Sequence, residues 1–84
     1  MDTITVVRQV SRVGNSNVIM LPARYAGRAL RILMTNDTGA AEFESRAVAF
    51  GNGCYVVIPA PLAERFPPHT VAIVHVMEVE KNAR

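Results

Sequence analysis

Two stretches decide the fold: residues 13–28 read VGNSNVIMLPARYAGR, and residues 50–65 read FGNGCYVVIPAPLAER. They align without a gap, whereas unrelated stretches of this length would share roughly one residue by chance. The chain is therefore predicted to contain one structural unit twice, over residues of about 3–39 and 40–80. Six aligned pairs are identical, namely Gly14/Gly51, Asn15/Asn52, Pro22/Pro59, Ala23/Ala60, Ala26/Ala63 and Arg28/Arg65.

Each copy carries the same local signals in the same order. The Gly-Asn pairs favour tight hairpin turns, because both residues tolerate the left-handed backbone conformations that such turns need. The continuous apolar runs at 18–21 and 55–58 predict strands that are covered on both faces. Pro22 and Pro59 end these strands and suit the first turn of a short helix. Helices are expected at 23–30 and 60–66, and further strands at 3–13, 31–35, 41–50 and 71–79.

The pattern strand–turn–strand–helix–strand, read twice, predicts a mostly β fold with two short helices in a single domain over residues 1–84. A lone hairpin is marginal in water, so each half needs the other. Two such units can close into a small β-barrel with the helices at its ends, and closure removes exposed sheet edges. A pseudo-two-fold barrel is therefore expected.

Length and composition predict a cytoplasmic protein. The chain has 84 residues, half of them hydrophobic, and no apolar run approaches the roughly 18–20 residues that span a bilayer. No basic leader or cleavable apolar stretch is visible at the first residues, and the one cysteine excludes an internal disulfide. No membrane partner is expected.

Neither catalysis nor a cofactor is predicted. Metal sites need several His, Cys or carboxylate ligands at suitable spacing, and the chain has one cysteine and two histidines. Nothing in the sequence places a base beside Cys54, so His69 and His75 are interpreted as structural. Glu42 and Glu44 are read as a solvated strand face. The sequence therefore predicts a protein that is not an enzyme and binds no metal.

Charge is unevenly distributed, although the net charge is only +2. Five arginines precede residue 32 against the single acid Asp2. This imbalance suits an anionic partner, while the alternative is that these arginines merely solvate an apolar domain. Arg8 and Arg12 lie two pleats apart on one predicted strand, so both are expected on one face, where they could contact phosphates or guanine edges. Asn15 and the turn amides could hold a phosphate.

Arg12-Val13-Gly14-Asn15-Ser16, followed by the apolar strand and Pro22-Ala23, resembles the AbrB/MazE/SpoVT family of swapped-hairpin DNA-binding proteins. The resemblance implies a barrel of interleaved hairpins whose first strand and turn face DNA. Members that bind DNA often carry basic residues where this chain has Ser11 and Met20, and the second copy has Ala49 in place of Arg12. The predicted DNA-binding residues are Arg8, Arg12, Asn15, Ser16 and Asn17.

Two functions remain open at this point. The first is a DNA-binding transcriptional regulator whose partner is duplex DNA. The alternative is a small protein-binding modulator, of phage or plasmid origin, that docks on a host complex through an apolar strand edge without binding DNA. Assembly is open too: one chain holds about the content of a family dimer, which favours a single-chain pseudo-dimer akin to cradle-loop barrels over a homodimer.

Overall fold

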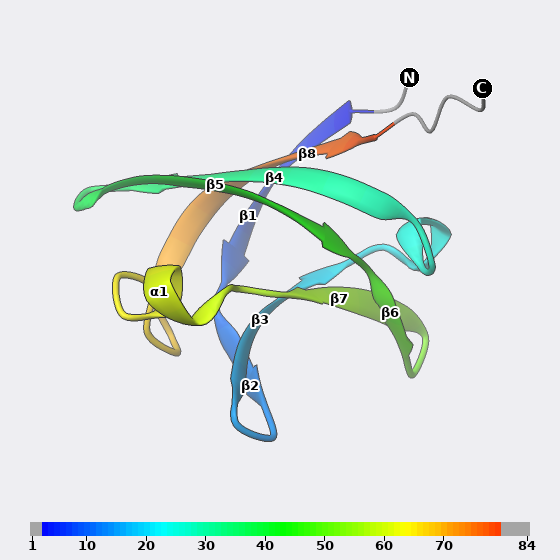
Figure 1. Ribbon diagram of the computed structural model, residues 1–84, viewed down its shortest axis with the longest axis horizontal. Coiled ribbons are helices and arrows are strands. Elements are labelled where there is room, and N and C mark those ends of the chain that lie inside the picture. The colour runs from blue at the N-terminus through cyan, green and yellow to red at the C-terminus, as the bar shows by residue number, and fades with distance from the viewer. Residues whose placement is uncertain (1–2, 80–84) are drawn as a thin grey trace.

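The structure is a computed structural model that describes residues 3–79 and contains two antiparallel sheets, one 3-10 turn and one short α-helix (Figure 1). The prediction of a mostly β chain is confirmed. Residues 1–2 and 80–84, which the predicted domain includes, lie outside the described part. Within residues 3–79 no helix is long and apolar enough to cross a membrane. The elements are β1 (Thr3–Gln9), β2 (Ser11–Val13), β3 (Ser16–Leu21), η1 (Ala23–Tyr25), β4 (Ala29–Asn36), β5 (Gly39–Arg46), β6 (Val48–Phe50), β7 (Gly53–Val57), α1 (Ala60–Ala63) and β8 (Val71–Glu78).

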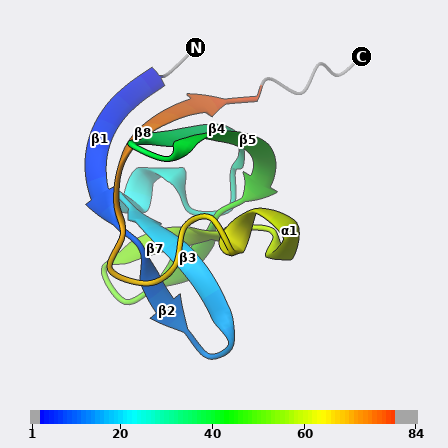
Figure 2. The same cartoon turned by 90° about the vertical axis from the view of Figure 1, so that its left-hand side faces the viewer.

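The strand order of both sheets stays the same when the two halves of the chain are exchanged. The first sheet has the order β1-β8-β4-β5, and the second has the order β2-β3-β7-β6. Each outer strand of the first sheet therefore pairs with a strand of the other half. Figure 2 shows the first sheet curving over the second, with the connections at their margins.

The register follows the same exchange. Leu33 and His75, each the fifth residue of its strand, pair with one another at the centre of the first sheet. Ile19 and Val56, each the fourth residue of its strand, pair at the centre of the second sheet. A two-fold axis through these two pairs relates the ladders on either side.

The core lies between the two sheets and is formed by alternate residues of their strands. On β4 and β8 the residues that face the core are buried and their neighbours are more exposed, as expected for strands with one covered face. Tyr25 and Phe66, which follow the two prolines, are the largest fully buried side chains. The remaining fully covered members include Ile19, Leu30, Ile32, Met34, Cys54, Val56 and Val74.

The strand predicted over 3–13 is wrong, because it is interrupted at Val10. The Val10 amide donates to the Thr70 carbonyl, and the Val10 carbonyl accepts from the His69 amide, both at 2.8 Å. Ala47 makes the matching pair of bonds with Gly27 and Arg28, and it interrupts the strand predicted over 41–50. At both points the chain leaves the first sheet and enters the second.

These two corners correct the predicted closed barrel. Hydrogen bonds join the strands into two separate four-stranded sheets, and no ladder among the described residues links one sheet to the other. The sheets are connected through the chain at Val10 and Ala47 and through the shared core. The molecule is therefore an open two-sheet structure with free edges at β1, β5, β2 and β6.

The helix predicted over 23–30 is also wrong, because only η1 forms there. Gly27 has a φ of 80°, and its amide donates to the Ala47 carbonyl, so the backbone turns out of the helix into β4. The helix predicted over 60–66 is shorter than expected and ends at Ala63. Phe66 follows, with its side chain in the core.

His69 occupies the position that matches Gly27, and it is the one described non-glycine residue with a positive φ, at 77°. A left-handed conformation costs roughly 1–2 kcal/mol in a residue with a Cβ atom. We expect His69→Gly to raise the free energy of unfolding by up to about 1 kcal/mol, since glycine also loses more entropy on folding. Gly27→Ala should lower it by about 1 kcal/mol, although its Cβ would meet nothing within 4 Å. Urea unfolding measures both changes, and a loss of stability in His69→Gly or a gain in Gly27→Ala would contradict the shared corner geometry.

Candidate nucleic-acid interface at the β2–β3 hairpin

The hairpin of β2 and β3 is closed by the two-residue turn Gly14-Asn15, since Val13 pairs with Ser16. Gly14 has a φ of 59°, and Asn15 does not share the positive φ. This combination is the one that a type II′ turn needs, with glycine at its first central position. Gly51, with a φ of 58°, repeats the arrangement in the second copy. The hairpin projects beyond the body of the molecule (Figure 1).

Arg12 lies on this hairpin with an exposed side chain. Its Nε donates to the Gly14 carbonyl at 3.4 Å, which is a long bond. Arg12 pairs with Asn17, so both side chains point to the same side of the second sheet as Ile19 and Leu21, which belong to the core. Arg12 and Asn17 therefore lie on the inner side of the second sheet, beyond the edge of the core.

Arg8 lies in a different environment. It is half-buried on the side of β1 that carries Ile4 and Val6, and its Nε donates to the Met20 carbonyl at 2.9 Å. Because the strand is interrupted at Val10, Arg8 and Arg12 do not share one face of one strand, contrary to expectation. Arg8 joins β1 to β3 across the corner between the sheets.

Asn17 also has a partner within the fold. Its Nδ2 donates to the Phe66 carbonyl at 3.2 Å and lies 3.5 Å from the Ala63 carbonyl. These bonds tie the hairpin to the end of α1, in the other half of the chain. Nothing near Asn17 in the sequence signals this contact, because its acceptors lie more than 45 residues away.

The structure brings four of the five predicted residues around one groove. The groove is open and shallow, with a volume of about 480 Å³. Glu64 also lines it, so one side of the groove repels an anion, while the Arg12 side attracts one. Arg8 does not belong to this set. The lining residues are Arg12, Asn15, Ser16, Asn17, Val57, Ile58, Pro59, Ala60, Ala63 and Glu64.

The other described arginines are spread over the fold and contact groups within it. Arg31 forms an ion pair with Glu44 at 2.8 Å, and this hydrogen bond raises the pKa of the Arg31 guanidinium. Arg28 pairs with Glu78, and the Arg24 guanidinium lies 5.0 Å from the centre of the Tyr25 ring. The arginine-rich N-terminal half thus does not form one basic surface.

The outer face of the second sheet bears no charged residue. Arg12 is the one charged residue in β2, β3, β6 and β7, and it points to the inner side. Phe50 is 49% exposed, and its ring meets the Tyr55 ring edge-on at 5.5 Å. No sequence pattern near Phe50 predicts this pair, because only the register of β6 and β7 brings the two rings to one side. The outer-face residues are Ser11, Val13, Ser16, Val18, Met20, Val48, Phe50, Gly53, Tyr55 and Val57.

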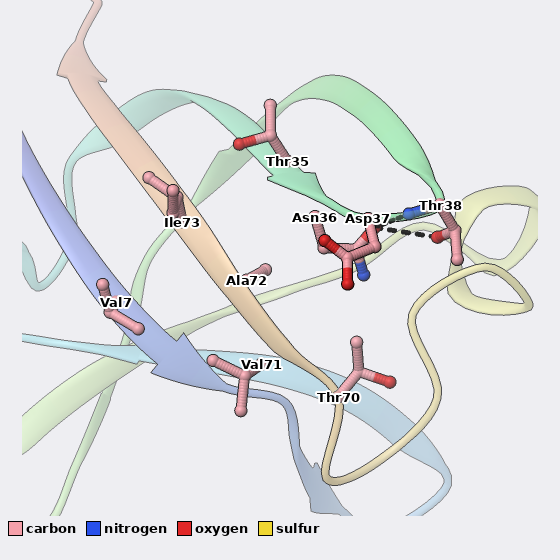
Figure 3. Close-up of a pocket in the computed structure, with 9 residues that line it drawn as sticks. All are labelled: Val7, Thr35, Asn36, Asp37, Thr38, Thr70, Val71, Ala72 and Ile73. Atoms are coloured by element: carbon pink, nitrogen blue, oxygen red, sulfur yellow. Dashed lines mark hydrogen bonds between the residues drawn. The ribbon is translucent and has the colours of Figure 1, made fainter.

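A second depression, of about 660 Å³, lies at one end of the first sheet (Figure 3). Val7, Val71 and Ile73 form its apolar side, and the β4–β5 turn forms its polar side. The Asn36 Oδ1 accepts from the Thr38 amide and hydroxyl, so these polar groups are used within the turn. No group of three His, Cys, Asp or Glu residues suited to a metal occurs within residues 3–79.

Cys54 is buried, and its Sγ donates to the Pro22 carbonyl at 3.1 Å. Desolvation raises the pKa of the Cys54 thiol, and a backbone hydrogen bond from Tyr25 offsets part of this rise. A pKa raised in the folded state stabilises the fold at low pH, and this stability is lost above the unfolded thiol pKa of about 8.5. We therefore expect the free energy of unfolding to fall above pH 8.5 and Cys54→Ala to weaken this fall, as measured by urea titration across pH. A slope that Cys54→Ala leaves unchanged would contradict this.

Comparison of the chain with protein-family models, curated proteins and solved structures finds no match. Inferences about function therefore rest on the residues and their geometry. The hairpin groove brings together an exposed guanidinium and a tight turn, and the outer face beside it lacks charge. These two surfaces are the candidates for a functional contact.

Proposed function

We propose that this protein is a DNA-binding regulator that contacts the duplex backbone through the tip of the β2–β3 hairpin. The observation that carries the proposal is the grouping of Arg12, Asn15 and Ser16 at one projecting turn. Arg12 supplies a planar cation, and the turn supplies short polar groups, which together suit a phosphate. This grouping also matches the residues that the AbrB/MazE/SpoVT resemblance assigns to DNA.

The proposal assigns different roles to the predicted residues. Arg12, Asn15 and Ser16 contact the phosphate backbone. Arg8 and Asn17 hold the hairpin in place, because their side chains donate to the Met20 and Phe66 carbonyls. The duplication of the hairpin supports a single-chain pseudo-dimer, with halves of about 3–39 and 40–80, in which the second hairpin carries Ala49 where the first carries Arg12. Binding is therefore asymmetric.

The salt dependence of duplex binding tests the proposal. Each phosphate neutralised on B-DNA contributes about 0.9 to the slope of log affinity against log salt. We expect Arg12→Ala to reduce the slope by about this amount and Ala49→Arg, at the matching position of the second hairpin, to increase it. Affinity is measured by fluorescence anisotropy on duplexes selected from a random pool.

Arg31→Ala is the matched control, since it removes the same charge from the outer face of the first sheet. It should leave the slope near the wild-type value. An Arg12→Ala protein that binds like wild type, with the same slope, would rule out contact through the hairpin. So would equal losses in Arg12→Ala and Arg31→Ala, which would indicate only a response to net charge.

One observation favours the second candidate, a protein-binding modulator: the uncharged outer face of the second sheet, with Phe50, Val48 and Val57 exposed. Apolar patches of this kind often mark protein contacts. If this function is correct, no duplex should bind above background, and Phe50→Lys should abolish retention of a purified host partner that Arg12→Ala still retains. DNA binding that is lost only in Arg12→Ala favours the first function.

A further inference from the structure

The two edges of the first sheet occupy matching positions but differ in chemistry. Because Val10 and Ala47 are matching corners, Val7 of β1 corresponds to Glu44 of β5, and Thr5 corresponds to Glu42. Ile73 of β8 likewise corresponds to Arg31 of β4, each being the third residue of its strand. On the β5 side these positions hold exposed charges that form ion pairs. On the β1 side they are uncharged.

The uncharged side forms a patch that we call the β1 patch, defined by Val7, Val71 and Ile73. Val7 is 63% exposed and Val71 is 56% exposed. Figure 3 shows the three side chains on two adjacent strands, on the outer side of the sheet. The same backbone therefore carries solvated ion pairs at one edge and exposed β-branched residues at the other.

The main chain of β1 is also available along this edge. Val10 exchanges hydrogen bonds with His69 and Thr70, which continues the ladder between β1 and β8. In an antiparallel ladder, alternate residues bond to the same neighbour. The amides and carbonyls of the odd-numbered residues, including Thr5 and Val7, therefore point away from β8 toward the free edge, where the Val7 carbonyl accepts one hydrogen bond from Arg8.

Charged side chains normally protect an edge strand from pairing, and β5 is protected in this way by Glu42, Glu44 and Arg46. The single charge on β1 is Arg8, whose Nε donates to the Met20 carbonyl and whose Nη1 donates to the Val7 carbonyl at 3.2 Å. The outer side of β1 therefore carries no charge that repels a second uncharged strand, and the Arg8 Nη1 shares or leaves the Val7 carbonyl when that strand pairs. The outer side of β1 also has no basic side chain that would favour an acidic peptide as the partner of this edge.

We propose that two copies of this chain associate through the free edge of β1, with the two β1 strands pairing antiparallel. Full overlap of Thr3–Gln9 places Val6 on the two-fold axis and Thr5 of one copy opposite Val7 of the other. Such β-branched pairs stabilise neighbouring strands. The interface is isologous and closes as a dimer, whereas pairing of β1 with β5 would continue into a filament and set Val7 against carboxylates. The small contact makes the dimer weak and dependent on concentration.

Sedimentation equilibrium over a range of protein concentrations, without DNA, tests the proposal. We expect the wild-type mass to rise from one chain to two. Val7→Lys should raise the dissociation constant at least about tenfold, because it sets two lysines close together across the axis. Val7 is exposed, so this variant should keep the fold, which circular dichroism checks. Amide exchange at Thr5 and Val7 should slow at concentrations where the dimer forms.

Ala40→Lys is the matched control, since Ala40 is exposed, lies in the same row of the sheet as Val7 and belongs to the opposite edge. It should dimerise like wild type. A wild-type mass of one chain at all concentrations up to about 1 mM, near the weak limit of specific association, would overturn the proposal. Species that keep growing, or a dimer that Val7→Lys leaves intact, would also overturn it. All of these outcomes are independent of DNA binding.

Discussion

Phe66→Ala is expected to lower the free energy of unfolding by about 3–5 kcal/mol, which is the usual cost of deleting a fully buried phenylalanine ring. Phe66 is fully buried and lies directly after the turn that ends α1. Small domains have only about 5–15 kcal/mol in total, so the variant should be much closer to unfolding at ambient temperature. The midpoint of urea unfolding, followed by circular dichroism, measures the loss.

Phe50→Ala provides the control, because it deletes the same ring from a site that is 49% exposed. Its only described ring contact is the edge-on pair with Tyr55, so we expect a loss of about 1 kcal/mol or less. Equal losses in the two variants would contradict the placement of Phe66 between the two sheets. A Phe66→Ala protein as stable as wild type would contradict it more strongly.

Asn17→Ala is expected to cost about 1–2 kcal/mol, because it leaves the Phe66 carbonyl without its Asn17 donor at a partly buried site. Asn15→Ala makes the same chemical change at the exposed turn and should change stability by less than about 0.5 kcal/mol. For the affinity for duplex DNA we expect the opposite order. Asn15→Ala should weaken duplex binding directly, while Asn17→Ala should weaken it less, and only because the hairpin becomes less firmly held. Unfolding curves and duplex titrations of the two variants test both halves of this expectation.

If Asn15→Ala destabilised the fold as much as Asn17→Ala, the division of the hairpin into supporting and contacting residues would be wrong. The same holds if Asn17→Ala kept full stability but lost duplex binding. In that case the Asn17 amide would reach the ligand directly, and its bond to the Phe66 carbonyl would break on binding.

The features that could be predicted from the sequence are those set by neighbouring residues. Gly14 and Gly51 close hairpins because glycine accepts the positive φ of a tight turn. Pro22 and Pro59 end strands because proline has no amide for the ladder. The continuous apolar runs before them form β3 and β7 at the middle of the second sheet.

The features that could not be predicted depend on partners far along the chain. The interruption at Val10 is produced by bonds to His69 and Thr70, and nothing between residues 3 and 13 marks it. The helix expected over 23–30 does not form, because Gly27 bonds to Ala47. The repeated strand pattern alone predicts a closed barrel, because it does not reveal these two corners.

The candidate site shows the same division. Arg12 and Asn15 could be placed at the hairpin from the turn alone. The inward direction of Arg8 could not, because its acceptor belongs to Met20 on another strand. The uncharged outer face could not be predicted either, since only the register shows that Phe50, Tyr55 and Met20 point to one side.

Titration of ¹⁵N-labelled protein with a selected duplex, followed by two-dimensional NMR, tests the proposed function most directly. We expect the amide signals of Arg12, Asn15 and Ser16 to shift most, with smaller changes at the matching turn of Asn52. Signals of Phe50 and Val48, which lie on the outer face and do not line the groove, should stay in place. Shifts confined to the outer face, or no shifts with any duplex, would contradict DNA binding through the hairpin.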